Sequence, residues 1–234
     1  MRTHERGKDL RDLKDTRDAR DAGKSLPADL GGGERGRALP EEAVGEGFIP
    51  PHGGYENLLS FQKARIVFDG TVRFCERLLK KSDRTYDQMV QAARSGKQNI
   101  LEGSEASGIS KETEIKLTGV ARASLGELLE DYRDFLRLRG EEEWSKDHRY
   151  TRRLRQLNRQ PGANYETFKK GIKNPDPIIA ANVMIGLIKL TNYLLDQQLR
   201  QLETAFIQEG GLRERMTRAR LAHRARAQSP LRES

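Results

Sequence analysis

The strongest constraint on the fold is one stretch near the C-terminus, 177–209, which has the pattern of a long amphipathic helix. Asp176 can cap it, and Pro177 occupies the first helical position, where its missing N–H costs nothing. Gly210 and Gly211 then end the pattern. The wide apolar stripe comprises Ile179, Val183, Met184, Leu187, Thr191, Leu194, Leu195, Gln198, Leu202 and Phe206. A helix of about 30 residues is about 45 Å long, so this stripe requires partner helices of comparable length.

Three further stretches with helical spacing supply such partners. In the first, 56–81, the apolar positions are Phe61, Ala64, Phe68, Val72, Cys75 and Leu79. In the second, 85–103, they are Met89, Ala92, Ala93, Gly96 and Ile100. In the third, 111–139, they are Ile115, Leu117, Val120, Ala121, Leu125, Leu128, Tyr132 and Phe135. Together with 177–209 they give four long helices.

The start signals of the second and third helices differ in kind. Thr85 followed by Gln88 predicts a capping box for the second helix. Ser110 predicts an N-cap for the third, with Glu112 and Glu114 placing negative charge at the positive end of the helix dipole. A turn of small residues near 106–107 joins the two helices, which makes them antiparallel neighbours.

The sequence therefore predicts an all-α fold, an antiparallel four-helix bundle over residues 55–210. No stretch alternates apolar and polar residues for long enough to indicate a sheet. A crossover insertion, 141–175, separates the third and fourth long helices. Asp147 is a candidate cap for a short helix in it, and Tyr165 and Phe168 are candidates to dock a second short segment on the bundle.

The two ends of the chain differ from the middle and from each other. Residues 1–54 carry ten basic and eleven acidic side chains and few large apolar ones, so we expect this segment to be disordered. The C-terminal tail, 211–234, carries seven arginines and two glutamates, and its pattern predicts a basic helix. The whole chain has a net charge of +8.

Composition limits the chemistry that we expect. The chain has one cysteine, Cys75, four scattered histidines and no glutamate with a histidine three residues later, so no carboxylate-bridged metal site is expected. Cys75 has no histidine in its helix and is expected to be a buried thiol. We expect no catalytic residues, metal or cofactor, hence no enzyme. With no long uninterrupted apolar run and no leader pattern, we also expect a cytoplasmic protein without membrane contact.

Two groups of arginines are candidate nucleic-acid contacts, because clustered guanidinium groups bind phosphate backbones without sequence preference. The first group lies in the crossover and comprises Arg149, Arg152, Arg153 and Arg155, with Tyr150 beside them for stacking. The second lies in the tail and includes Arg213, Arg215, Arg218 and Arg220. The alternative for both groups is a solvated charged face.

Two polar pairs interrupt the apolar faces of the bundle. Asn99 and Glu102 lie near the end of the second helix, and Ser124 and Glu127 lie in the third. A turn near 106–107 places Ser124 level with Met89, so the two pairs are not expected to touch within one hairpin. Either they satisfy helix ends and close packing, or they make a polar contact between subunits that fixes register.

Residues 95–103 and 121–128 together resemble a bacterial family of four-helix-bundle proteins. The family is named for its coding position in intervening sequences of 23S ribosomal RNA genes, and its usual patterns are Ser-Ile-Pro-x-Asn-Ile-x-Glu-Gly and Ala-Arg-Gly-Ser-x-x-Glu-Leu. Here Gly96 and Lys97 replace the Ile-Pro pair, and Ala123 replaces the glycine. The matching positions are Asn99, Ile100, Glu102, Gly103, Ser124, Glu127 and Leu128. The stretches 192–197 and 210–216 resemble the subgroup with a C-terminal suffix.

The resemblance implies a barrel-shaped homopentamer with no established enzymatic activity. A related branch, the accessory variability determinant of diversity-generating retroelements, shares the bundle, binds nucleic acid and works with a reverse transcriptase. The sequence thus favours a non-enzymatic, ring-forming accessory protein that binds RNA or DNA, RNA first, with a reverse transcriptase or another protein as a possible partner. The alternative is a structural scaffold that contacts proteins only.

Overall fold

The computed structural model describes residue 49 and residues 52–228, and the segment expected to be disordered, 1–54, lies almost entirely outside them. After a 3-10 turn at Tyr55–Asn57, the long helices are α1 (Leu59–Leu78), α2 (Arg84–Ala106), α3 (Lys111–Arg137) and α6 (Pro177–Glu209). Two short helices, α4 (Arg149–Asn158) and α5 (Tyr165–Ile172), form the crossover, and α7 (Leu212–Gln228) follows α6. The described part of the chain is all-α and contains no strand.

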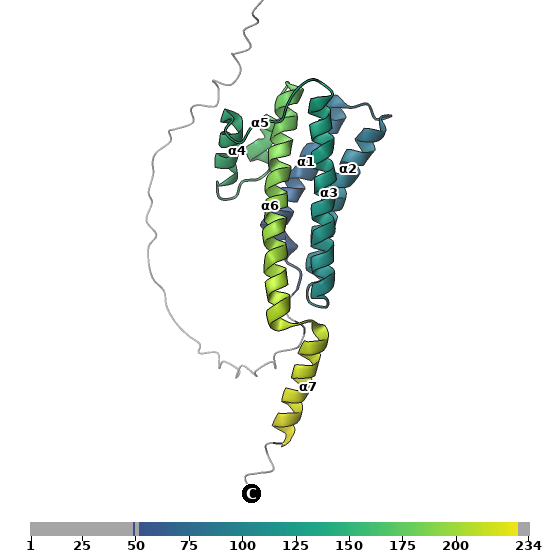
Figure 1. Cartoon of the computed structure of the whole chain (residues 1–234), viewed down its shortest axis with the longest axis vertical. Helices are drawn as coiled ribbons and strands as arrows, with labels where there is room; N and C mark the ends of the chain where they lie inside the picture. Colours follow the sequence, from purple (N-terminus) through teal and green to yellow (C-terminus); the bar gives the residue numbers. More distant parts are fainter. Residues whose placement is uncertain (1–48, 50–51, 229–234) are drawn as a thin grey trace, which may run out of the picture. The chain divides into compact units, whose positions relative to one another are not determined.

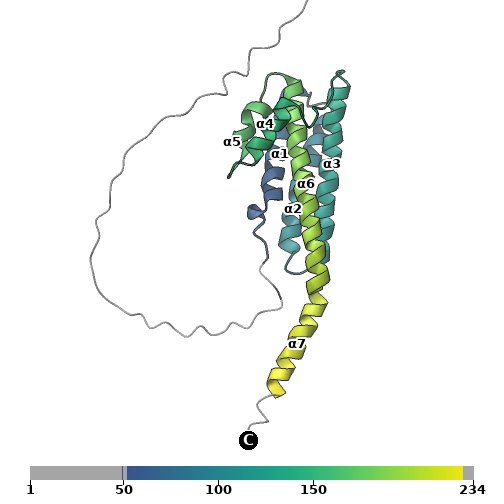
Figure 2. The same cartoon turned by 60° about the vertical axis from the view of Figure 1, so that its left-hand side comes forward.

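The four long helices pack as a bundle in which each has two long neighbours. α1 contacts α2 and α6, and α3 contacts the same two helices from the other side (Figures 1 and 2). Their directions alternate: Ser60, near the start of α1, donates to Gln198 in the second half of α6, whereas Gly70 lies against Met184 near the start of α6. The short turn between α2 and α3 makes that pair antiparallel too.

Two of the expected helix starts are confirmed by their hydrogen bonds. The Ser110 hydroxyl accepts from the Thr113 backbone N–H at 3.1 Å, and the Asp176 carboxylate accepts from the Ile178 N–H at 2.9 Å. Both caps satisfy backbone donors that the first helical turn leaves without a partner. Pro177 follows directly as the first residue of α6.

Two other expected caps are wrong. α2 begins one residue before Thr85, with Asp83 at its N-cap and no side-chain capping bond, so the Thr85 capping box does not form. α4 begins after His148 rather than at an Asp147 cap. In both places the residue before the helix makes no side-chain capping bond, so the cap does not specify the boundary.

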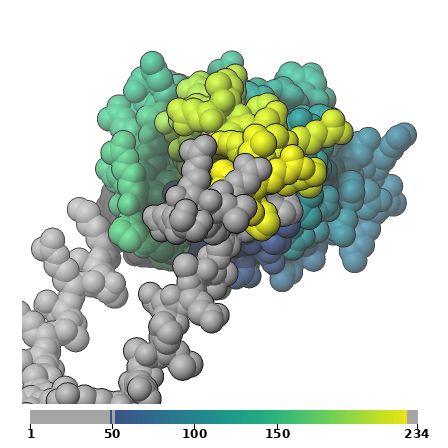
Figure 3. All heavy atoms as spheres, turned by 90° about the horizontal axis from the view of Figure 1, so that it is seen from below, coloured from purple at the N-terminus to yellow at the C-terminus, as the bar shows by residue number. Residues whose placement is uncertain are grey.

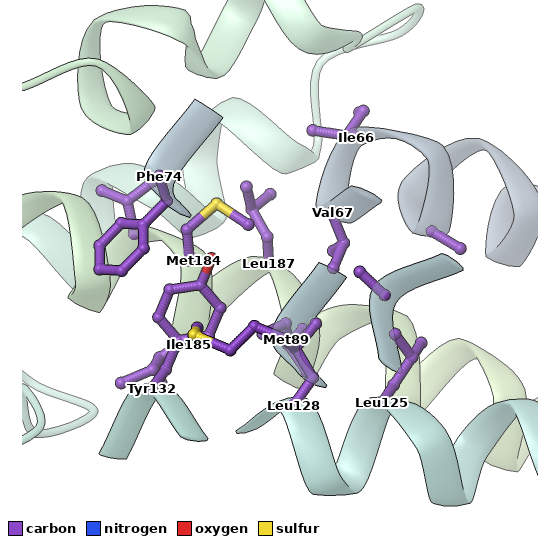
Figure 4. Close-up of a cluster of buried hydrophobic side chains, with 14 of the residues drawn as sticks. Ile66, Val67, Phe74, Met89, Leu125, Leu128, Tyr132, Met184, Ile185 and Leu187 are labelled. Carbon is purple, nitrogen blue, oxygen red and sulfur yellow. The ribbon is translucent and has the colours of Figure 1, made fainter. Parts of the chain in front are cut away.

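The core lies between the four long helices, and the crossover extends it. Figure 4 shows Phe74 of α1, Met89 of α2, Leu125, Leu128 and Tyr132 of α3 and Met184, Ile185 and Leu187 of α6 converging from all four. Full burial of one such side chain contributes about 1.5–3 kcal/mol. The Tyr132 hydroxyl, which burial keeps protonated by raising its pKa, donates to the Thr71 hydroxyl at 3.1 Å.

The apolar stripes differ from expectation in α1 and α3. Three of the α1 positions expected in the stripe, Phe61, Ala64 and Cys75, are buried, whereas Phe68, Val72 and Leu79 are only half-buried. Ile66, Val67 and Phe74, which the pattern did not include, are buried as well. Val120 of α3 is 47% exposed. It lies one residue, and therefore about 100° around the helix, from the buried Ala121.

α6 supplies the most apolar surface of the bundle. By length and composition alone, the helical stretch Pro177–Ala227 contains a segment that would suit a membrane span, with a mean hydropathy of 1.6. Of that segment, 56% is buried inside the protein. α1 and α3 pack against α6, so burial within the bundle accounts for its apolar composition.

Candidate nucleic-acid interface

The crossover is fixed to the bundle through Glu143. Its carboxylate accepts from Arg133 Nε of α3 at 3.0 Å and also from Lys189 Nζ of α6. Burial raises the pKa of Glu143, but the hydrogen bonds from Lys189 and Arg133 outweigh that effect and hold it below its ordinary value. The start of the crossover is therefore tied to both α3 and α6.

Trp144 follows directly and is positioned by Asn182 of α6. The Trp144 backbone N–H donates to Asn182 Oδ1 at 2.8 Å, and Asn182 Nδ2 donates to the Ile178 carbonyl at 3.1 Å. Asn182 is only 3% exposed. Because both ends of its amide are engaged, its orientation is fixed, and the Trp144 backbone is held against the bundle.

Three aromatic side chains gather at the start of α4, and we call them the ring cluster: Trp144, His148 and Tyr150. Trp144 and His148 stack with their centroids 4.6 Å apart and their planes inclined by 23°. Tyr150 lies 5.0 Å from Trp144 and 5.3 Å from His148. All three are half-buried, so the cluster has an exposed side.

The four arginines expected to contact nucleic acid in the crossover are all exposed on α4, next to the ring cluster. The Arg149 guanidinium lies 4.5 Å from the Tyr150 ring centroid and donates to the Tyr150 hydroxyl at 2.8 Å, which is a cation–π contact within α4. Arg153 makes a long hydrogen bond, 3.4 Å, to Gln156. The side chains of Arg152 and Arg155 make no hydrogen bond or ion pair to the described residues.

One apolar contact holds α4 on α6. Leu154 is buried, and a Cβ added at Gly186 would lie 2.2 Å from Leu154 Cδ2. Gly186 therefore leaves the space into which the leucine side chain fits. This contact turns the arginines of α4 toward solvent.

The structure separates the four tail arginines into two kinds. Arg213 and Arg220 are exposed on α7 and have no hydrogen bond or ion pair to any described residue. Arg215 donates to the Gly108 carbonyl at 3.3 Å, with its Nε and Nη1 buried and unpaired, and Arg218 donates to the Glu209 carbonyl. Arg215 and Arg218 thus hold the start of α7 near the end of the bundle, which leaves Arg213 and Arg220 for an external ligand.

The two arginine groups do not form one surface within a chain. α4 packs at Gly186 of α6, whereas α7 begins after Gly210 at the far end of the same helix. At 1.5 Å per residue, these points are about 35 Å apart. A single short nucleic-acid segment therefore meets one group or the other.

The motif residues of the second and third helices lie elsewhere, on the α2–α3 face. Gly103 is buried, and a Cβ there would lie 3.4 Å from the Glu114 carbonyl. Asn99 and Ser124 are half-buried, and Glu102 and Glu127 are exposed. Lys97, at the position where the resemblance departs, is half-buried and places its ammonium 4.4 Å from the Phe68 ring centroid.

The expected register of the α2–α3 hairpin is wrong, although the two polar pairs are joined only through Ser95 among the described residues. Ser124 lies level with Ser95, not with Met89, and the two hydroxyl oxygens are 3.1 Å apart. Asn99 Nδ2 donates to the Ser95 hydroxyl at 3.1 Å and to its carbonyl at 2.8 Å, so Ser95 links Asn99 with Ser124. The reason is that α2 continues through Gly103 to Ala106, which moves the turn to residues 107–110.

An open groove of about 700 Å³ runs beside this serine pair between α2 and α3. Its lining comprises Arg84, Asp87, Gln88, Gln91, Ala92, Ser95, Ser124, Glu127 and Asp131. Three carboxylates face one guanidinium group there. Burial, Asp134 and Glu127 raise the pKa of Asp131, so this carboxylate is held in a repulsive environment.

Two other kinds of site are a reactive cysteine and a cluster of metal-binding side chains. Cys75 is buried, as expected, and burial raises the pKa of its thiol to about 12. Among residues 52–228, no three His, Cys, Asp or Glu side chains gather closely enough to hold a metal ion.

Sequence reasoning missed three contributors: Trp144, His148 and Ser95. The signal for the first was present, because the chain's one tryptophan stands five residues before an arginine-rich segment. The ring cluster itself depends on the turn between Trp144 and α4, which no residue pattern specifies. Comparison of the chain with protein-family models, with curated proteins and with solved structures found no match.

Proposed function

We propose that the chain is a non-enzymatic, ring-forming accessory protein that binds RNA through the arginines of α4, with Arg213 and Arg220 of α7 as a second contact. The observation that carries the proposal is the exposed arginine surface of α4, held against the ring cluster. Guanidinium groups that replace condensed counterions supply sequence-independent affinity, and neighbouring aromatic rings add contact with bases.

The charge of the whole chain supports a polyanionic ligand. A net charge of +8 and a sequence pI of about 9.6 raise the local concentration of nucleic acid. Each α4 surface is small, so one copy gives weak binding. Several copies in a ring multiply it, because the second contact becomes intramolecular.

The groove between α2 and α3 supports the oligomeric part of the proposal. It carries Ser124 and Glu127, two residues of the motifs that resemble the pentameric family. In the view along the bundle, the green crossover with α4 lies on the opposite side of the molecule from the blue α2 (Figure 3). A subunit contact at the groove would therefore leave the α4 arginines uncovered.

RNA binding is tested by fluorescence anisotropy with a labelled 20-nucleotide RNA at several salt concentrations. We expect affinity to fall with salt and to fall again in the double variant Arg152→Glu, Arg155→Glu. For a single strand, the logarithmic salt slope decreases by about 0.7 for each lost phosphate contact. The matched control is Arg65→Glu, Arg94→Glu, two exposed arginines on α1 and α2 with the same change of charge. Equal losses in both double variants, or binding indifferent to salt, would refute the proposal.

The oligomer is tested by light-scattering mass after size exclusion. We expect a mass of about five subunits, in line with the family that the motifs resemble. Ser124→Arg, which fills the groove, is expected to lower that mass, whereas Arg94→Glu outside the groove keeps it. A monomer in the unaltered protein would contradict the ring.

The groove also favours a second candidate function, a scaffold that contacts proteins only. Its three carboxylates suit a basic protein surface rather than nucleic acid. In that case the oligomer mass does not change when RNA is added at low salt. A mass that rises with RNA and returns at high salt excludes the scaffold.

A further inference from the structure

We infer that the ring cluster Trp144, His148 and Tyr150 is a stacking platform for unpaired nucleobases, so that the protein selects single-stranded RNA over duplex of equal charge. The inference rests on the proposed function and deepens it by naming the form of the ligand. It predicts that the protein distinguishes single-stranded from duplex RNA. The arginines alone cannot do so, because both forms of RNA carry phosphates.

The cluster is built as a platform rather than as part of the core. Trp144 packs against the buried core residues, and His148 and Tyr150 contact Trp144 through their rings. His148 directly precedes α4 and Tyr150 lies in its first turn, and both are half-buried with their rings in contact. Stacked rings anchored at one end and exposed at the other match the requirement for base stacking, since every base offers a flat π-face.

Contacts within the protein position the platform. The Asn182 carboxamide fixes the Trp144 backbone at 2.8 Å, and Trp144 in turn stacks on His148 at 4.6 Å. The Arg149 guanidinium lies 4.5 Å from the centroid of the Tyr150 ring. A prearranged site loses less entropy on binding, because side chains do not have to be ordered at that step.

Phosphate contacts are available at the same place. Arg149 lies at the ring cluster, and Arg152 and Arg153 follow one helical turn later, about 5 Å along α4. All three are exposed. A strand whose bases contact the rings therefore passes its phosphates along the arginines. In a duplex the bases are paired and stacked on one another, so only the phosphates reach the protein.

The Nδ1 atom of His148 lies within the ring cluster. It is buried and has no hydrogen-bond partner among the described residues. Buried polar atoms are nearly always paired in native proteins.

Trp144 makes the test direct, because it is the one tryptophan of the chain and its fluorescence reports on the cluster alone. The full-length protein is titrated with a 20-nucleotide unstructured RNA, with a 20-base-pair RNA duplex and with inorganic polyphosphate, at one salt concentration. We expect the single strand to quench Trp144 and to bind about tenfold more tightly than the duplex, since stacking one base contributes a factor of this order or more. Polyphosphate is expected to bind without quenching.

Tyr150→Leu identifies the contribution of stacking while keeping Trp144 as the reporter. We expect single-strand affinity to fall about tenfold, with duplex and polyphosphate affinities unchanged and the circular-dichroism melt preserved. The control is Tyr193→Leu, a tyrosine on α6 that is 58% exposed and lies outside the cluster. Equal affinity for single strand and duplex, or an unchanged single-strand affinity in Tyr150→Leu, overturns this inference and leaves the proposed function standing. Failure of all three probes to bind overturns both.

Discussion

The Ser95 hydroxyl of α2 lies 3.1 Å from the Ser124 hydroxyl of α3, and this pair sets the register of the hairpin. Asn99 donates to Ser95 from one turn further along α2, so a polar chain of three side chains crosses between the helices. The next residue of α2, Gly96, is buried at the same interface, where a Cβ would lie 2.7 Å from the Leu125 side chain. Close backbone approach and the serine pair therefore specify the same alignment.

The serine pair is expected to stabilise the hairpin modestly. Ser95→Ala and Ser124→Ala should each lower the free energy of unfolding by about 1 kcal/mol, because each leaves a half-buried hydroxyl without its partner. In the double variant the cost should be less than the sum, since both variants remove the same contact. Urea denaturation measures all three, with Ser82→Ala in the exposed turn before α2 as control. Additive costs would mean that the two hydroxyls are not coupled.

Asp131 is expected to destabilise the protein at neutral pH. Burial, Asp134 and Glu127 raise its pKa above the ordinary value of 3.8, so the native state binds the proton more tightly than the unfolded state does. The stability from that proton is complete below pH 3.8 and is lost as the pH rises through the raised pKa. Asp131→Asn should therefore raise the melting temperature at pH 7 and have no such benefit below pH 3.8.

The control for Asp131 is its neighbour Asp134, which forms an exposed ion pair with Arg137 at 2.8 Å. Asp134→Asn removes the attraction to Arg137 together with the repulsion of Asp131, so little change in melting temperature is expected at pH 7. A lower melting temperature for Asp131→Asn than for the unaltered protein would show that the groove carboxylates are not mutually repulsive.

Cys75 predicts slow thiol chemistry and a loss of stability in alkali. Burial raises its pKa from 9.0 to about 12, so its contribution to stability is complete below pH 9.0 and disappears as the pH rises to about 12. Cys75→Ala should cost about 1–2 kcal/mol at pH 7, as for other small losses of core volume, and should flatten the fall in stability above pH 9. Urea melts from pH 7 to 11 measure this change.

A second measurement on Cys75 uses its reactivity. A disulfide reagent is expected to label the folded protein only as fast as it unfolds, because the thiol is completely buried. Rapid labelling in the absence of denaturant would contradict the burial of α1 against its neighbours.

Sequence patterns predicted the elements of the fold well where several local signals agreed. For α6, the Asp176 cap, the following proline and the closing glycines all mark the same boundaries, and the helix runs from Pro177 to Glu209. Where one signal stood alone, at Thr85 or Asp147, tertiary contacts overrode it. A capping side chain contributes only about 1 kcal/mol, less than the packing that competes with it.

The candidate site was predictable in composition but not in geometry. The arginines of α4 are visible in the sequence, and so is Tyr150 beside them. In α7, Arg215 donates to the Gly108 carbonyl and Arg218 donates to the Glu209 carbonyl. Both bonds depend on the direction in which α7 leaves α6. The ring cluster likewise requires Trp144 to meet His148 across a turn whose path is set by Asn182, 38 residues away.

The docking of α4 on α6 is expected to be necessary for RNA binding. Gly186→Val adds a Cβ that would lie 2.2 Å from Leu154 Cδ2, and Leu154→Ala removes the anchor from the other side. Each should weaken α4 docking by about 1–3 kcal/mol, raise hydrogen exchange in residues 149–158 and lower RNA affinity. The bundle should melt at nearly its normal temperature, because α4 packs outside the four long helices. In the double variant the valine at position 186 fills the space that Leu154→Ala empties. This double variant should therefore regain part of the lost RNA affinity. The control is Gly126→Ala, at an α3 position with open space around it. If exchange in α4 rises while RNA affinity stays the same, the arginines of this helix are not the interface.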